Sequence, residues 1–67
     1  MLSILVNGEP REVPEGTTAA DLVTASELAP DQVAVEINRA LVARATRAER
    51  ALETGDRVEL VTLVGGG

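Results

Sequence analysis

The 67-residue sequence contains no cysteine, histidine, lysine, phenylalanine, tryptophan or tyrosine. Without cysteine, neither a disulfide nor a thiolate metal site can stabilise the fold. Enzymes usually take their general base, thiolate nucleophile or Schiff-base amine from histidine, cysteine, lysine or tyrosine, and this chain has none of these residues. We therefore expect no catalysis by the side chains of this chain, and no bound metal or cofactor.

The charge balance and the lack of aromatic residues exclude further classes. A net charge of −5 opposes binding to a phosphate backbone, and no aromatic side chain is available to stack on a base. No apolar run approaches the roughly 20 residues of a membrane span, and no basic-then-apolar leader is present. We expect neither nucleic acid nor membrane as a partner, and predict a cytoplasmic protein that is monomeric when free.

Apolar residues make up 45% of the chain, which is typical of a globular domain. The length allows one domain, whose core must be built from valine, leucine and isoleucine. We predict a single domain over residues 1–64, followed by a flexible glycine tail over residues 65–67.

The first elements are a hairpin and a helix. Residues 2–6 and 9–13 are predicted as strands joined by Asn7-Gly8, the dipeptide that favours a type I′ turn. Pro10 lacks an N–H, so the second strand should lie at a sheet edge. Thr18 and Asp21 resemble a capping box, and the helix that they begin should end near Ser26 or Glu27, before a proline.

The second half of the chain predicts three strands and a helical turn. Residues 33–37 alternate as a strand, and a turn at Asn38-Arg39 leads to a short strand over 41–43. Residues 46–49 read as a full capping box that begins a short helical turn. The final strand, 57–64, is the most apolar and should be central in the sheet.

These elements predict an α+β architecture, in which one main helix covers one face of a mixed sheet of about five strands. A short helical turn precedes the last strand, and the first and last strands should be neighbours in the middle. This arrangement is the β-grasp, or ubiquitin-like, fold.

The glycine end is the feature that suggests chemistry. Gly65, Gly66 and Gly67 have no Cβ and could extend about 10 Å into a narrow channel of another protein. A partner that uses ATP could convert the terminal carboxylate of Gly67 to an acyl-adenylate, which a sulfur or amine nucleophile would then attack. The alternative is a flexible end without a role.

A surface beside this tail could bind the partner. If Val58 and Leu60 face the helix, then Val61 and Leu63 face outward, and Leu5 on the neighbouring strand should join them. Exposed apolar residues next to the tail would form a docking patch that also includes Gly65. Scattered exposed apolar residues are, however, normal on protein surfaces.

The chain resembles the ThiS family, the sulfur carrier proteins of thiamine biosynthesis. The resemblance is carried by Val6-Asn7-Gly8-Glu9, Thr18 with Asp21-Leu22-Val23, residues 33–38, residues 55–61 and the glycine end, although Arg39 stands where many members have glycine. It implies that a ThiF-type adenylyltransferase adenylates Gly67 with ATP, with Gly66 giving access. Sulfur from a cysteine desulfurase or sulfurtransferase then forms a thiocarboxylate, which a ThiG-type thiazole synthase uses to build the thiazole ring.

The resemblance leaves other functions open. The small subunit of molybdopterin synthase has the same fold and a Gly-Gly end, and other ubiquitin-like sulfur carriers share the mechanism. A non-catalytic interaction domain is the alternative from a different class. Because the sequence has no cysteine, a sulfur carrier of this composition must use its C-terminus instead of a side-chain persulfide.

Overall fold

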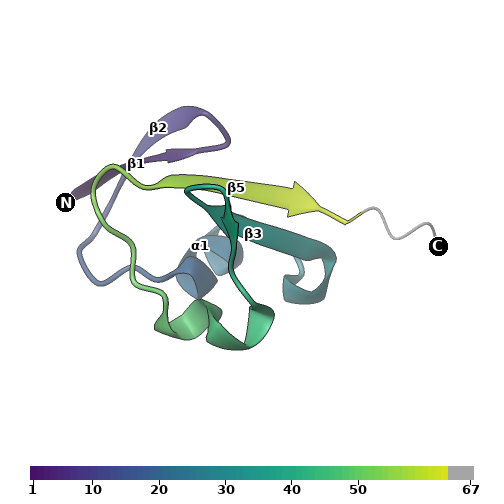
Figure 1. Cartoon of the computed structure of the whole chain (residues 1–67). Coiled ribbons are helices and arrows are strands. Elements are labelled where there is room, and N and C mark those ends of the chain that lie inside the picture. The colour runs from purple at the N-terminus through teal and green to yellow at the C-terminus, as the bar shows by residue number, and fades with distance from the viewer. Residues whose placement is uncertain (64–67) are drawn as a thin grey trace.

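A computed structural model describes residues 1–63. The strands are β1 (Leu2–Val6), β2 (Glu9–Val13), β3 (Val33–Ile37), β4 (Ala40–Leu41) and β5 (Arg57–Thr62); the helix is α1 (Ala19–Ala25), and the two 3₁₀ helices are η1 (Pro30–Gln32) and η2 (Arg44–Glu49). The strands form one sheet in the order β2-β1-β5-β3-β4. Figure 1 shows α1 and the green turn of η2 on the same side of this sheet. The predicted layers and the β-grasp arrangement are confirmed.

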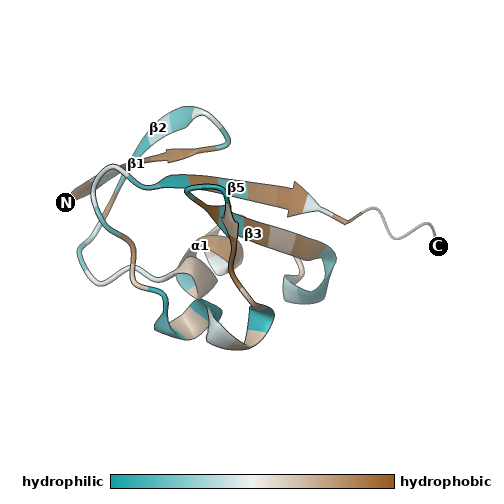
Figure 2. Ribbon diagram, viewed as in Figure 1, coloured by the Kyte–Doolittle hydropathy of each residue, from teal (hydrophilic) through white to brown (hydrophobic). Residues whose placement is uncertain are grey.

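β5 is the central strand, as its apolar composition predicts. It pairs in parallel with β1 and antiparallel with β3, and the brown shading of Figure 2 is concentrated on these strands. β2 lies at the edge of the sheet, where Pro10 is opposite Leu5. Because no strand within residues 1–63 lies on the other side of Pro10, its missing N–H does not remove a hydrogen bond between strands. The order therefore places the most apolar strand where both of its edges can be paired.

Local signals in the first half of the chain predict the observed turns and caps. Asn7 and Gly8 have φ of 52° and 84°, the left-handed values that a type I′ turn requires. Thr18 is the N-cap of α1, and the capping box with Asp21 is complete. α1 ends with Ser26 as its C-cap, within the predicted limits.

Three predicted boundaries in the second half are wrong. The fourth strand is Ala40–Leu41 instead of 41–43, because Asn38 and Arg39 both adopt positive φ and the tight turn starts pairing at Ala40. The capping box predicted over 46–49 does not form. Thr46 lies inside η2, which starts at Arg44, and its hydroxyl donates to the Ala43 carbonyl 3.0 Å away.

The third correction concerns the final strand, which ends at Thr62. Leu63 still donates its N–H to the Gln32 carbonyl at 2.8 Å, so the chain continues beside the start of β3 for one more residue. Val64 lies outside the described residues.

The core lies between the sheet and the two helical elements. Val35 and Val58 from the sheet and Ala19 from α1 are almost completely buried. The buried apolar cluster consists of Ile4, Val13, Ala19, Leu22, Val23, Val33, Val35, Ile37, Leu52, Val58 and Leu60. Every member is aliphatic, which agrees with the expectation that valine, leucine and isoleucine build the core.

Candidate functional site

The two faces of β5 are separated as the alternation predicts. Val58 and Leu60 are buried at 1% and 9% exposure. Val61 and Leu63, on the opposite face, are 48% and 52% exposed. Since successive side chains of a strand point to opposite sides, the outer face of the sheet receives two large apolar residues where the described chain ends.

Neighbouring strands add apolar surface at the same end of the sheet. Ala34 on β3 pairs with Val61, and Leu41 on β4 is 70% exposed. Ala34, Leu41 and Leu63 together line an open hollow of about 230 Å³. We name Ala34, Leu41, Val61 and Leu63 the apolar patch. Ala34 and Leu41 were not predicted from the sequence as part of this surface. The predicted short strand after residues 33–37 could have indicated them, because pairing of the two strands brings both residues to the outer face.

Leu5 lies at a different place on the outer face. It is half-buried and pairs with Arg57, at the opposite end of β5 from Val61. Four residues of strand separate the two positions, or about 13 Å at roughly 3.3 Å per residue. Leu5 lines a second hollow, of about 210 Å³, with Arg39, Arg57 and Glu59. The structure therefore brings Val61 and Leu63 together and places Leu5 apart from them.

A buried arginine supports the segment that holds the end of β5. Arg47 of η2 is 6% exposed, and its guanidinium donates to the carbonyls of Pro30 at 3.0 Å and Val33 at 2.7 Å. Between these two residues, the Gln32 carbonyl accepts the N–H of Leu63. Arg47 thus fixes the backbone against which the exit from β5 is bonded. This role could not be predicted from the residue pattern, because an arginine inside a helical turn is normally exposed.

Burying Arg47 also carries a cost in free energy. The Arg47 Nε is buried and has no hydrogen-bond partner among residues 1–63. A buried polar group without a partner costs free energy, so the two carbonyl bonds must outweigh it.

The remaining predicted site residues, Gly65, Gly66 and Gly67, lie outside the described residues. In the described part of the chain, no three or more aspartate or glutamate side chains are grouped so that they could hold a metal ion. No helix within residues 1–63 has the length and apolarity needed to cross a membrane.

The sheet order, the single main helix and the exposed end of the central strand define a ubiquitin-like protein of the β-grasp class. The family model that matches is the ThiS family, over residues 4–67. The chain belongs to the ThiS family, as the sequence motifs predicted.

Comparisons with individual proteins agree with this assignment. The crystal structure of the thiamine biosynthesis protein ThiS from Geobacter metallireducens superposes with a TM-score of 0.83 at 30% identity, covering 98% of this chain and 100% of that one. Two thiazole synthases also match. Those of Magnetococcus marinus and Paramagnetospirillum magneticum are 41% and 32% identical to this chain over 66 residues. Each match covers 98% of this chain, which spans only 20% of the length of either synthase.

Proposed function

We propose that this chain is a sulfur carrier that supplies the sulfur of the thiazole ring in thiamine biosynthesis. The observation that carries the proposal is the ThiS family match, which continues from the folded domain through the three terminal glycines. The solved ThiS structure from Geobacter metallireducens, a thiamine biosynthesis protein, supports the same pathway. The chain acts as the substrate of partner enzymes and is not itself an enzyme.

The proposed chemistry takes place at the carboxylate of Gly67. A ThiF-type adenylyltransferase joins this carboxylate to the AMP portion of ATP and releases pyrophosphate. A persulfide sulfur that derives from a cysteine desulfurase or sulfurtransferase then displaces AMP and leaves an acyl disulfide. A thiol of the partner system attacks this sulfur–sulfur bond, forms a disulfide with the cysteine that delivered the sulfur, and releases the thiocarboxylate. ATP is therefore used by the activating enzyme, and no cofactor is assigned to the carrier.

A ThiG-type thiazole synthase is the proposed acceptor. Two thiazole synthases contain a segment that is similar to nearly the whole of this chain. Carrier and synthase regions in one polypeptide are consistent with proteins that work together. This observation favours the thiamine pathway over the small subunit of molybdopterin synthase.

The apolar patch is the proposed docking surface for these partners. Val61 and Leu63 lead directly to Gly65, so an enzyme that receives the tail has its surface next to them. Burying such exposed aliphatic side chains favours association by about 25 cal/mol per Å² of apolar surface removed from water. Leu5 would make a separate contact further along the outer face.

Intact-mass spectrometry of the protein from its native host tests the proposed function. Under sulfur-replete, thiamine-starved conditions, we expect a fraction of the chains to have one terminal oxygen replaced by sulfur. Incubation with purified thiazole synthase and its other substrates should return this fraction to the carboxylate. A thiocarboxylate that only molybdopterin synthase consumes would move the carrier to that pathway. Carboxylate alone under all conditions would indicate an interaction domain.

Leu63→Asp is expected to weaken binding to the adenylyltransferase at least about tenfold, or about 1.4 kcal/mol. The aspartate would have to lose its hydration when the partner covers the patch. Leu63 is half-exposed, lies outside the buried core cluster and keeps its backbone N–H bond in the variant, so the thermal melt should be nearly unchanged. Isothermal titration calorimetry measures the affinity.

Ala51→Asp provides the matched control for this variant. Ala51 is exposed, lies outside the apolar patch, and pairs through its backbone with Thr18. The variant adds the same negative charge as Leu63→Asp, but at a position outside the patch, so binding should be unchanged. Equal affinities for the two variants would show that the patch does not contact the enzyme.

A further inference from the structure

The central strand β5 has one edge that is only half covered. β1 pairs with it at Leu5–Arg57 and Val6–Val58, and the chain then turns away at Asn7-Gly8. On the other edge, β3 pairs with β5 as far as Thr62. Figure 1 shows β5 continuing beyond the hairpin of β1 and β2. Among residues 1–63, a strand therefore lies beside only one edge of the last residues of β5.

The hydrogen-bond register shows which backbone groups point to the open side. Arg57 accepts from Asn38, and Leu63 donates to Gln32, so the odd-numbered residues of β5 bond to the β3 side. The register alternates along an antiparallel pair, and Thr62 opposite Val33 is therefore a pair without hydrogen bonds. The N–H and C=O of Thr62 point away from β3.

Asn7 marks the end of the covered part. Its N–H donates to the Val58 carbonyl at 2.8 Å, and its side-chain Oδ1 accepts the Leu60 N–H at 2.9 Å. Within residues 1–63, no hydrogen bond reaches the Leu60 carbonyl or either backbone group of Thr62. One donor and two acceptors thus form a row along the open edge, which is the pattern that an added strand recognises.

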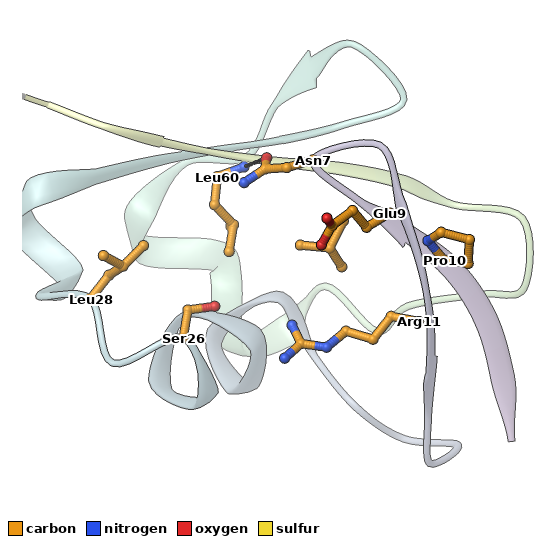
Figure 3. A pocket seen from close by; sticks show the side chains of 8 residues that line it. Asn7, Glu9, Pro10, Arg11, Ser26, Leu28 and Leu60 are labelled. Atoms are coloured by element: carbon orange, nitrogen blue, oxygen red, sulfur yellow. Dashed lines mark hydrogen bonds between the residues drawn. The ribbon is translucent and has the colours of Figure 1, made fainter.

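A hollow beside this edge would accept a side chain. Its volume is about 330 Å³, and Val6, Leu28 and Leu60 supply its apolar lining. Figure 3 shows the Asn7 amide against β5 at Leu60, with Leu28 on the far side of the hollow and Arg11 and Glu9 at its rim. The rim therefore carries one charge of each sign, and Asn7 and Ser26 add neutral polar groups to the lining, so the hollow suits an uncharged side chain.

We propose that the thiazole synthase, one of the two enzymes that receive the tail, adds an extended segment to the open edge of β5 at Leu60–Thr62 and places an uncharged side chain in the hollow lined by Val6, Leu28 and Leu60. This proposal rests on the proposed function. The edge leads directly into residues 64–67, so the protein that binds these residues lies alongside it. Backbone pairing here fixes the direction in which the tail leaves the domain.

Amide hydrogen exchange measured by NMR tests the occupancy of the edge. In the free protein, the Thr62 N–H should exchange at least about tenfold faster than those of Val61 and Leu63, which face β3. Purified thiazole synthase should slow the Thr62 exchange at least about tenfold. Protection of Thr62 in the free protein, whether from this chain or from a second copy, would overturn the proposal.

Proline substitutions provide the matched variants, because proline removes one N–H. Thr62→Pro should keep a melting temperature close to that of the wild type and bind thiazole synthase at least about tenfold more weakly. Thr62→Val retains the N–H and should bind normally. Val61→Pro removes an N–H that faces β3 and should lower the melting temperature by roughly 4–8 °C or more.

The results separate this proposal from the proposed function. If the synthase binds the wild type and leaves Thr62 unprotected, or binds Thr62→Pro as tightly, the strand addition is wrong and the sulfur-carrier function stands. If the synthase does not bind the wild type at all, both are contradicted. Protection of Thr62 on binding, together with the loss of affinity in Thr62→Pro, supports the added strand.

Discussion

Deleting Gly67 is expected to abolish ATP–pyrophosphate exchange by the cognate adenylyltransferase without lowering the melting temperature. The deletion draws the carboxylate back by one residue, roughly 3.3–3.6 Å. A displacement near 1 Å can already reduce a rate about a hundredfold, because the reacting atoms lose their alignment. The core cluster of the described residues extends from Ile4 to Leu60, and deleting a glycine removes no side chain, so the melting temperature should not change. Exchange activity and a thermal melt on the same sample are the measurements.

Two substitutions separate the length of the tail from its width. Gly66→Val keeps the length and adds a β-branched side chain, which should also abolish exchange if the channel admits only backbone. Gly67→Ala restores the position of the carboxylate with the smallest side chain and should retain part of the activity. Full exchange activity in the deletion variant or in Gly66→Val would contradict the assignment of the reactive carboxylate.

Asp56→Ala is expected to lower the free energy of unfolding by about 2–4 kcal/mol, because the substitution removes a buried acceptor. Asp56 is 6% exposed and accepts hydrogen bonds from the Asn38 side chain at 3.1 Å and the Glu53 N–H at 2.9 Å. Arg50 lies 3.4 Å away and completes the set. Each buried donor that loses its acceptor costs about 1–3 kcal/mol.

This loss is large compared with the total stability of such a domain. A core of this size supplies about 3–5 kcal/mol, so part of the Asp56→Ala population should be unfolded at 37 °C. Urea unfolding followed by circular dichroism gives the free energy. Glu53→Ala is the matched control, since Glu53 is exposed and its backbone N–H remains. Equal midpoints for the two variants would show that the Asp56 bonds contribute no stability.

The sequence predicts the elements whose signals are local. Asn7 and Gly8 both tolerate the positive φ that their turn requires. Thr18 and Asp21 each accept a hydrogen bond from the other's backbone N–H. Both features depend only on residues that are close in the sequence. The faces of β5 follow from strict alternation, which any buried strand enforces. The outward positions of Val61 and Leu63 could therefore be predicted without knowing the rest of the fold.

The errors arise where tertiary contacts override local signals. Thr46 has the residues of a capping box, but η2 begins two positions earlier because Arg47 must reach the carbonyls of Pro30 and Val33. Those carbonyls are distant in the sequence, so the residues around Thr46 could not predict these hydrogen bonds. Leu41 was missed for a related reason. Its place in the patch depends on β4 pairing with β3, and a two-residue strand carries too little periodicity to show its register.

The order of the strands also determines when the protein can fold during its synthesis. β5 is made last and lies between β1 and β3, so a nascent chain that ends before Arg57 holds only two separate hairpins. An isolated two-stranded hairpin is at best marginally stable in water. A stalled or truncated chain would therefore remain unfolded and be removed by proteases, which act on the unfolded population. The strand that leads to the glycines is thus also the one that joins the two hairpins into a single sheet, so the folded domain depends on residues 57–62.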